Sequence, residues 1–111
     1  MTDHIDTAKV LIRTWAEQQP AIRRVYLFGS RLRGTDKHGQ PVKPTSDIDI
    51  AVEMTFTDPD EAYDAYMDER WLPELQRLLP WPIDLQWFHP RGTPNVASYL
   101  ADCSEVIFER R

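Results

Sequence analysis

The sequence is poor in several features that mark particular classes of protein. It has 1 cysteine, Cys103, which excludes an internal disulfide and a zinc site built from cysteines. The first residues lack the apolar core of a signal sequence, and apolar runs such as 25–28 are too short to cross a membrane. Lys and Arg number 13 against 18 Asp and Glu, which disfavours binding to long nucleic acids. We therefore expect a cytoplasmic protein without membrane or direct nucleic-acid contacts.

The length and composition fit one globular unit. The chain has 111 residues, of which 41% are hydrophobic and 28% charged. These values lie in the range of ordinary folded domains, and no repeat or low-complexity segment interrupts them. We expect a single domain over residues 1–111.

Hydrophobic spacing predicts an α/β fold, with helices packed on a small mixed sheet. Near-helical spacing over 5–16 predicts a first helix that ends at Pro20, and a polar loop is expected over 34–45. The capping side chain of Asp58 before Pro59 predicts the start of another helix. At Pro73 we expect either a kink in that helix or a new short helix. The remaining predicted elements are strands over 25–28, 47–54, 83–87 and 106–108, and a helix over 94–102.

One predicted strand carries an acidic face. Asp47, Asp49 and Glu53 alternate with apolar residues and therefore point the same way. Asp47 and Asp49 would lie about 7 Å apart and repel each other by on the order of 2 kcal/mol. A divalent cation between them offsets this cost, and Asp84 on the next strand would complete a cluster of three carboxylates. We expect Glu53 to be a solvated glutamate at the strand end.

A glycine-serine turn follows the predicted buried strand. Gly29 lets the backbone approach a polyphosphate, and Ser30 supplies a hydroxyl and a backbone N–H as donors. Arg31 and Arg33 either neutralise phosphate charge or are ordinary surface arginines. The turn and the carboxylates together indicate metal-assisted phosphoryl or nucleotidyl transfer.

These motifs resemble a known family. Gly29, Ser30 and Arg31, then Asp47 and Asp49, then Asp84 are similar to the pattern of the DNA polymerase beta nucleotidyltransferase superfamily. The resemblance is to its minimal nucleotidyltransferases (MNT), which are encoded beside HEPN proteins as toxin-antitoxin pairs. It covers nearly the whole chain and implies a nucleotidyltransferase fold. One departure is the 16 residues between Ser30 and Asp47, where the family usually has about ten.

The resemblance also implies a mechanism and its residues. Gly29 and Ser30 would hold the triphosphate of ATP, with Arg31 beside them. Asp47, Asp49 and Asp84 would be the catalytic residues and the Mg²⁺ ligands. The implied acceptor is a tyrosine of a cognate HEPN ribonuclease toxin, which adenylylation silences within a hetero-oligomer. Two alternatives stay open, a small-molecule transferase of the aminoglycoside type and an antitoxin that acts by binding alone.

The length of the chain and its aromatic residues give a further expectation about the acceptor. The predicted helices and strands use nearly all of the chain and leave no segment to build a closed acceptor pocket. We therefore expect a partner protein to supply the other wall of the acceptor site. We expect aromatic side chains from the set Tyr63, Tyr66, Trp71 and Trp81 to anchor a basic partner, although aromatic residues at such spacing usually serve packing.

Overall fold

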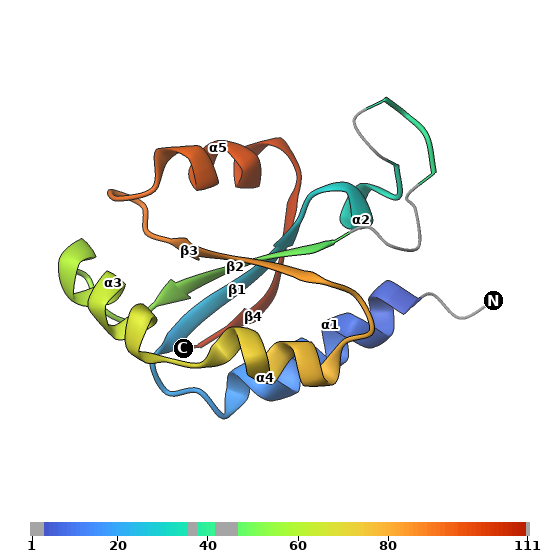
Figure 1. Ribbon diagram of the computed structural model, residues 1–111. Coiled ribbons are helices and arrows are strands. Elements are labelled where there is room, and N and C mark those ends of the chain that lie inside the picture. Colours follow the sequence, from blue (N-terminus) through green and yellow to red (C-terminus); the bar gives the residue numbers. More distant parts are fainter. Residues whose placement is uncertain (1–3, 36–37, 42–46, 111) are drawn as a thin grey trace.

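A computed structural model describes residues 4–35, 38–41 and 47–110, and its centre is a four-stranded mixed sheet (Figure 1). The strand order is β3-β2-β1-β4. β1 runs antiparallel to β2 and to β4, whereas β2 runs parallel to β3. The strands are β1 Ile22–Phe28, β2 Ile48–Met54, β3 Ile83–Phe88 and β4 Ser104–Glu109. The predicted mixed sheet is confirmed, and the strand that contains 25–28 lies in its interior.

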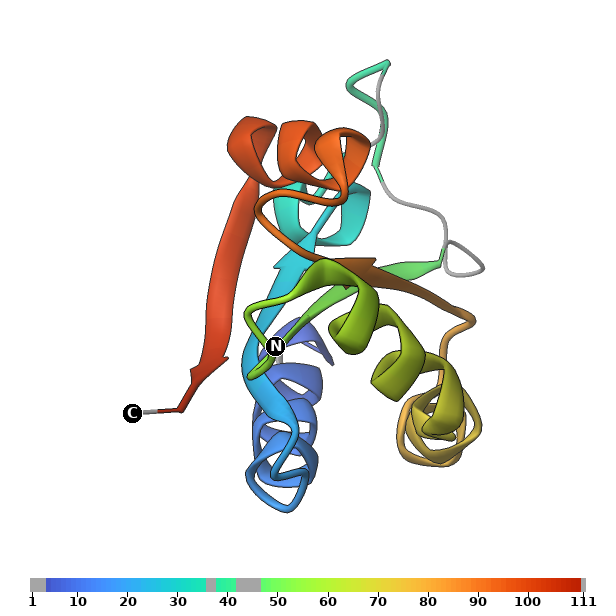
Figure 2. The same ribbon diagram turned by 90° about the vertical axis from the view of Figure 1, so that its left-hand side faces the viewer.

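Helices cover both faces of this sheet. α1 and α4 lie on one face and α5 on the other, as the two perpendicular views show (Figures 1 and 2). Alternate residues of β1 and β2, such as Val25 and Ile50, are buried toward α1 and α4, and a smaller cluster around Phe28 and Val96 lies beneath α5. The helices are α1 His4–Glu17, α2 Ser30–Arg33, α3 Pro59–Asp68, α4 Trp71–Leu78 and α5 Pro94–Asp102.

The start of α3 agrees with the prediction, but the boundary between α3 and α4 does not. Asp58 caps α3, because its carboxylate accepts a hydrogen bond of 3.0 Å from the N–H of Glu61. The chain leaves the helical conformation at Glu69, before Pro73. Pro73 lies in the first turn of α4, where a missing N–H removes no intrahelical bond. Of the two predicted alternatives, the structure shows the new short helix, which begins at Trp71, two residues before Pro73.

Glu53 corrects a second expectation, because its side chain is buried instead of solvated. It is only 6% exposed, and Arg24 approaches its two carboxylate oxygens at 3.3 and 3.4 Å. The hydroxyl of Tyr26 donates to it at 3.1 Å. Arg24 and Tyr26 lie on β1 beside β2, so the pairing of the two strands brings them to Glu53. The acidic face of β2 is thus divided into an accessible end near Asp49 and a buried end at Glu53.

Two tryptophans join the helices that cover one face. The rings of Trp15 and Trp71 meet edge to face with their centroids 6.0 Å apart. The Trp71 indole donates to Gln19 at 3.1 Å, and the Trp15 indole donates to Glu74 at 2.8 Å. Because Trp71 is 2% exposed, the expectation that it anchors a partner was wrong, and its role is in the core.

The structure describes the predicted loop over 34–45 only in part. Within the predicted loop over 34–45, Thr35 pairs with Pro41 in an isolated bridge, and residues 36–37 and 42–45 lie outside the described residues.

Among the helices formed by described residues, none has the length and apolar character needed to span a membrane.

Candidate active site

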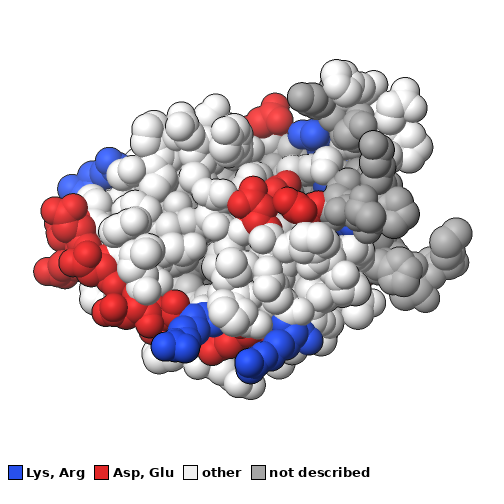
Figure 3. Space-filling model, in the orientation of Figure 1, with Lys and Arg blue, Asp and Glu red and all other residues white. Residues whose placement is uncertain are grey.

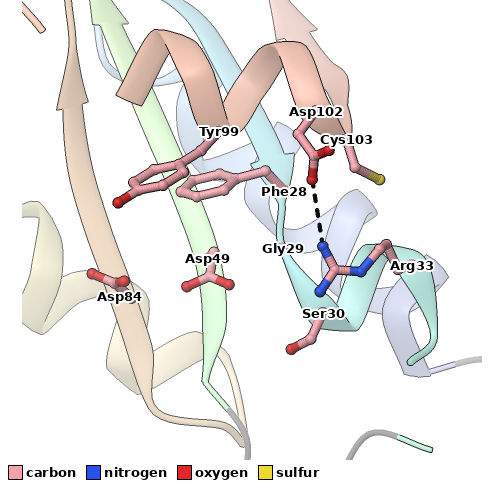
Figure 4. Close-up of a pocket in the computed structure, with 9 residues that line it drawn as sticks. All are labelled: Phe28, Gly29, Ser30, Arg33, Asp49, Asp84, Tyr99, Asp102 and Cys103. Carbon is pink, nitrogen blue, oxygen red and sulfur yellow. Dashed lines mark ion pairs between the residues drawn. The ribbon is translucent and has the colours of Figure 1, made fainter. Parts of the chain in front are cut away.

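The register of the sheet brings the predicted site residues together at one end of β1, β2 and β3. Asp49 lies opposite Asp84 in the parallel pair of β2 and β3. Asp49 also lies opposite Phe28, the last residue of β1, in the antiparallel pair. The turn at Gly29 and Ser30, which follows Phe28, is therefore directly beside Asp49, with Asp84 on the far side of Asp49 (Figure 4).

A pocket of about 510 Å³ opens at this place. The space-filling view shows acidic side chains exposed at the centre of the same face of the molecule (Figure 3). A second acidic group, visible at the left of that view, belongs to α3 and is separate from the pocket. The described residues that line the pocket are Phe28, Gly29, Ser30, Arg33, Asp49, Asp84, Tyr99, Asp102 and Cys103.

The Asp49 carboxylate at the floor of the pocket has a raised pKa. Burial, together with a hydrogen bond and the negative charge of Asp84, raises the pKa of Asp49 to about 7. The negative charge of Asp47 acts in the same direction, while Arg33 opposes it. Asp84 also accepts a hydrogen bond of 2.7 Å from the side-chain amide of Gln86, which orients it. The surroundings of Asp49 therefore disfavour its ionised form when no cation is bound beside it.

Gly29 is required at the turn for two separate reasons. Its φ of +82° is in the left-handed region that residues with a side chain rarely adopt. A Cβ atom at this position would also lie 2.0 Å from Oδ2 of Asp49, an impossible contact. Glycine therefore permits the Asp49 carboxylate to occupy its place against the backbone. The sequence prediction gave Gly29 a role toward phosphates, and the structure adds this direct contact with the acid.

The short helix α2 presents Ser30 and Arg33 to the pocket. The Ser30 hydroxyl points toward the open space beside Asp49 (Figure 4). Arg33 forms an ion pair with Asp102 at the end of α5, with 3.7 Å between nitrogen and oxygen. Arg33 and Asp102 are both partly accessible to solvent. The cationic side chain of Arg33 therefore lies next to the turn and within reach of a ligand bound there.

Arg31 lies elsewhere than predicted. Its guanidinium carbon is 4.4 Å from the centroid of the Trp81 ring, a cation–π contact. Burial lowers the pKa of Arg31, and the negative charge of Asp47 opposes that shift. Among the described residues, the arginine that lines the pocket is Arg33. Helical spacing is the signal that favours Arg33, since it lies one turn after Ser30 on the same side of α2.

Asp47 lies just before β2 and is exposed, outside the lining that the described residues form. Within the described part of the chain, no three His, Cys, Asp or Glu side chains gather closely enough to hold a metal ion. The structure thus brings Asp49 and Asp84 together and leaves Asp47 at the edge of the site. The donor set still fits Mg²⁺, because carboxylate oxygens are its preferred protein ligands and it usually uses one or two of them.

Three lining residues were not recognised as part of the site from the sequence. Tyr99 and Asp102 come from α5, and Cys103 follows it. The Tyr99 ring stacks on Phe28 with an interplanar angle of 7° and centroids 6.3 Å apart. No local motif marks these residues, because only the packing of α5 on the sheet brings them to the pocket.

A buried strand, a glycine-serine turn and paired acids on the neighbouring strands together define a nucleotidyltransferase fold. The family described as "Polymerase beta, Nucleotidyltransferase" matches residues 11–111, and the chain therefore belongs to this family. A comparison with curated proteins finds no match.

Solved structures give the same fold. A toxin-antitoxin crystallised with AMP-PNP has a TM-score of 0.61 and 25% identity, over 93% of this chain and 73% of its own. A toxin-antitoxin named MntA-HpeT, with two Asp-to-Glu substitutions, has a TM-score of 0.60 and 22% identity, over 94% of this chain and 74% of its own. A Sulfolobus solfataricus protein described as a nucleotidyltransferase has a TM-score of 0.50 and 20% identity, over 99% of this chain and 90% of its own. The fold thus resembles that of MNT antitoxin structures.

Proposed function

We propose that this chain is an antitoxin that transfers AMP from ATP to a tyrosine hydroxyl of a cognate HEPN ribonuclease toxin. The observation that carries the proposal is the pairing of Asp49 with Asp84 directly beside the turn at Gly29 and Ser30. Membership of the nucleotidyltransferase family supports the reaction class. The AMP-PNP in a similar structure supports ATP as the substrate, and the toxin-antitoxin structures support a toxin as the partner in a hetero-oligomer.

Each part of the pocket has a task in this reaction. Backbone N–H groups at the start of α2 and the Ser30 hydroxyl bind the β- and γ-phosphates, and the cation of Arg33 attracts them. Asp49 and Asp84, with Asp47 from the edge of the site, would hold Mg²⁺. When bound, Mg²⁺ neutralises phosphate charge and stabilises the leaving pyrophosphate.

The carboxylates also act on the acceptor. Asp84 is half-buried and lies farther from the turn than Asp49, which places it on the side from which an acceptor hydroxyl approaches (Figure 4). We assign to Asp84 the removal of the hydroxyl proton as the new bond to phosphorus forms. Bond formation by this oxygen and departure of pyrophosphate on the opposite side complete the transfer.

The test is co-expression of the chain with the product of the neighbouring gene, followed by purification of the complex and intact mass measurement of the partner. The proposal predicts that ATP and Mg²⁺ add AMP to a tyrosine of the partner. Asp49→Asn should abolish the addition, because it removes a metal-binding oxygen. Asp64→Asn is the matched control, since Asp64 is an exposed acid on α3, and it should transfer like the parent.

Other results would point elsewhere. An unmodified but tightly bound and silenced partner would contradict the transfer reaction and favour an antitoxin that acts by binding alone. Modification of an aminoglycoside with no change in the partner would favour the small-molecule reaction. Equal transfer by the parent and by Asp49→Asn would contradict the assignment of the site.

A further inference from the structure

Tyr99 lines the same pocket as the paired carboxylates, and its side chain is available for chemistry. It is 56% exposed, although its ring is held parallel to that of Phe28. Among the residues that the structure describes, its hydroxyl has no hydrogen-bond partner. A positioned ring with an accessible hydroxyl is what a nucleophile in this pocket requires.

The other three tyrosines of the chain are placed differently. Tyr26 donates its hydroxyl to the buried Glu53. Tyr63 lies in a separate hollow against Trp87, with ring centroids 5.2 Å apart. Tyr66 is half-buried and packs against Trp71. Tyr99 is therefore the tyrosine that lines the pocket with Asp49 and Asp84.

The order of groups across the pocket fits an in-line displacement. Figure 4 shows Ser30 at one side, Asp49 in the middle and Asp84 at the other side, with the Tyr99 hydroxyl on the side of Asp84. A triphosphate on the turn would direct its leaving pyrophosphate toward Ser30. The attacking oxygen must approach from the opposite side of the α-phosphorus, and Tyr99 presents an oxygen there.

We propose that Tyr99 is a self-modification site, to which the chain transfers AMP within its own pocket. The inference rests on the proposed nucleotidyltransferase function. The Tyr99 oxygen forms a bond to the α-phosphorus of ATP, the bond between that phosphorus and the oxygen bridging to the β-phosphorus breaks, and pyrophosphate leaves. The phenolic proton passes to the carboxylate of Asp84 and then to water.

The adduct would close the site. AMP attached to Tyr99 occupies the pocket in which the next ATP must bind, so each chain modifies itself once and then binds ATP no longer. An acceptor tyrosine of a partner would compete with Tyr99 for the same place beside Asp84. Self-modification thus regulates the chain in the absence of its partner.

The experiment incubates the purified 111-residue chain with ATP and Mg²⁺, measures its intact mass and maps any adduct by tandem mass spectrometry. The expected result is one AMP for each chain, located on Tyr99. Tyr99→Phe and Asp49→Asn should show no adduct. Tyr63→Phe is the matched control, because Tyr63 is also an exposed tyrosine, and it should be labelled like the parent. The initial rate for each molecule should stay constant on tenfold dilution.

The outcomes separate this inference from the proposed function when the same parent protein is also incubated with its partner. A chain that stays unmodified when it is incubated alone, but modifies its partner when the two are incubated together, would overturn the inference and leave the proposed function intact. If neither protein is modified, both are overturned. An adduct on another residue would overturn the inference. A rate for each molecule that falls with dilution would also contradict it, because the transfer would then occur between two copies.

Discussion

Asp49 is subject to three separate influences within the site. Gly29 leaves room for its carboxylate, Asp84 faces it from β3, and Asp47 adds negative charge from the start of β2. In the absence of a cation, these charges repel and destabilise the ionised site.

Asp49→Asn should therefore separate activity from stability. We expect transfer to be lost, while the melting temperature without Mg²⁺ equals or exceeds that of the parent, because the substitution removes a repelling charge. Thermal unfolding of both proteins in a metal-free buffer is the measurement. A variant that unfolds well below the parent would show that Asp49 has a structural role that the charge argument omits.

The two glycines that border α2 offer a matched pair of substitutions. Gly29 and Gly34 both have positive φ, +82° and +85°, so alanine at either should cost about 1 kcal/mol of stability. A Cβ at Gly34 meets no described atom within 4 Å, whereas one at Gly29 meets the Asp49 carboxylate. Gly29→Ala should therefore also displace Asp49 and reduce transfer by about 100-fold or more, about 3 kcal/mol in the barrier.

The measurements for this pair are chemical denaturation and the initial rate of AMP transfer. Gly34→Ala should lose stability but keep a rate close to that of the parent. Equal rates for the two variants would contradict the claim that Gly29 matters through its contact with Asp49.

At the scale of elements, α3 depends on a local cap that the structure shows directly. Asp58→Ala removes the acceptor for the Glu61 N–H and should cost about 1 kcal/mol in the free energy of unfolding. Asp60→Ala is the control, because Asp60 is an exposed residue within the same helix. Urea denaturation compares the two, and an equal loss in both would indicate that the cap contributes nothing beyond its negative charge at the helix start.

Local sequence patterns predicted most elements, and their failures have physical causes. The alternation in β2 and the cap at Asp58 are short-range signals, so they were readable from the chain itself. The burial of the Glu53 side chain depends on Arg24 and Tyr26 of the neighbouring strand, which bind its carboxylate. Likewise, Pro73 is compatible with a first helical turn, so its presence alone could not locate the break between α3 and α4.

The candidate site could be predicted only as far as the order of the strands in the sheet could be predicted. Once β2 and β3 are neighbours, the register places Asp49 beside Asp84. The sequence left both Arg31 and Arg33 open as phosphate contacts, and helical spacing after Ser30 favours Arg33. The contact of Arg31 with Trp81 was not predictable, because Trp81 comes from a distant part of the chain. The contribution of Tyr99 depended on how α5 packs across Phe28.

At the scale of the whole molecule, the sheet and its helices form a support on one side of an open site. α1 and α4 cover one face, and α5 covers the other while it supplies one wall of the pocket (Figures 1 and 2). The Tyr63 ring, which stays exposed, is the member of the predicted aromatic set best placed to meet a partner protein. The open side of the molecule is therefore where we expect a metal ion and a nucleotide to bind.

The most direct test is a crystal structure of the chain with AMP-PNP and Mn²⁺ in place of Mg²⁺. The account predicts an anomalous peak for the metal between the carboxylates of Asp49 and Asp84, and the terminal phosphates on the turn at Gly29 and Ser30. A nucleotide bound elsewhere, or a metal that contacts neither carboxylate, would contradict it.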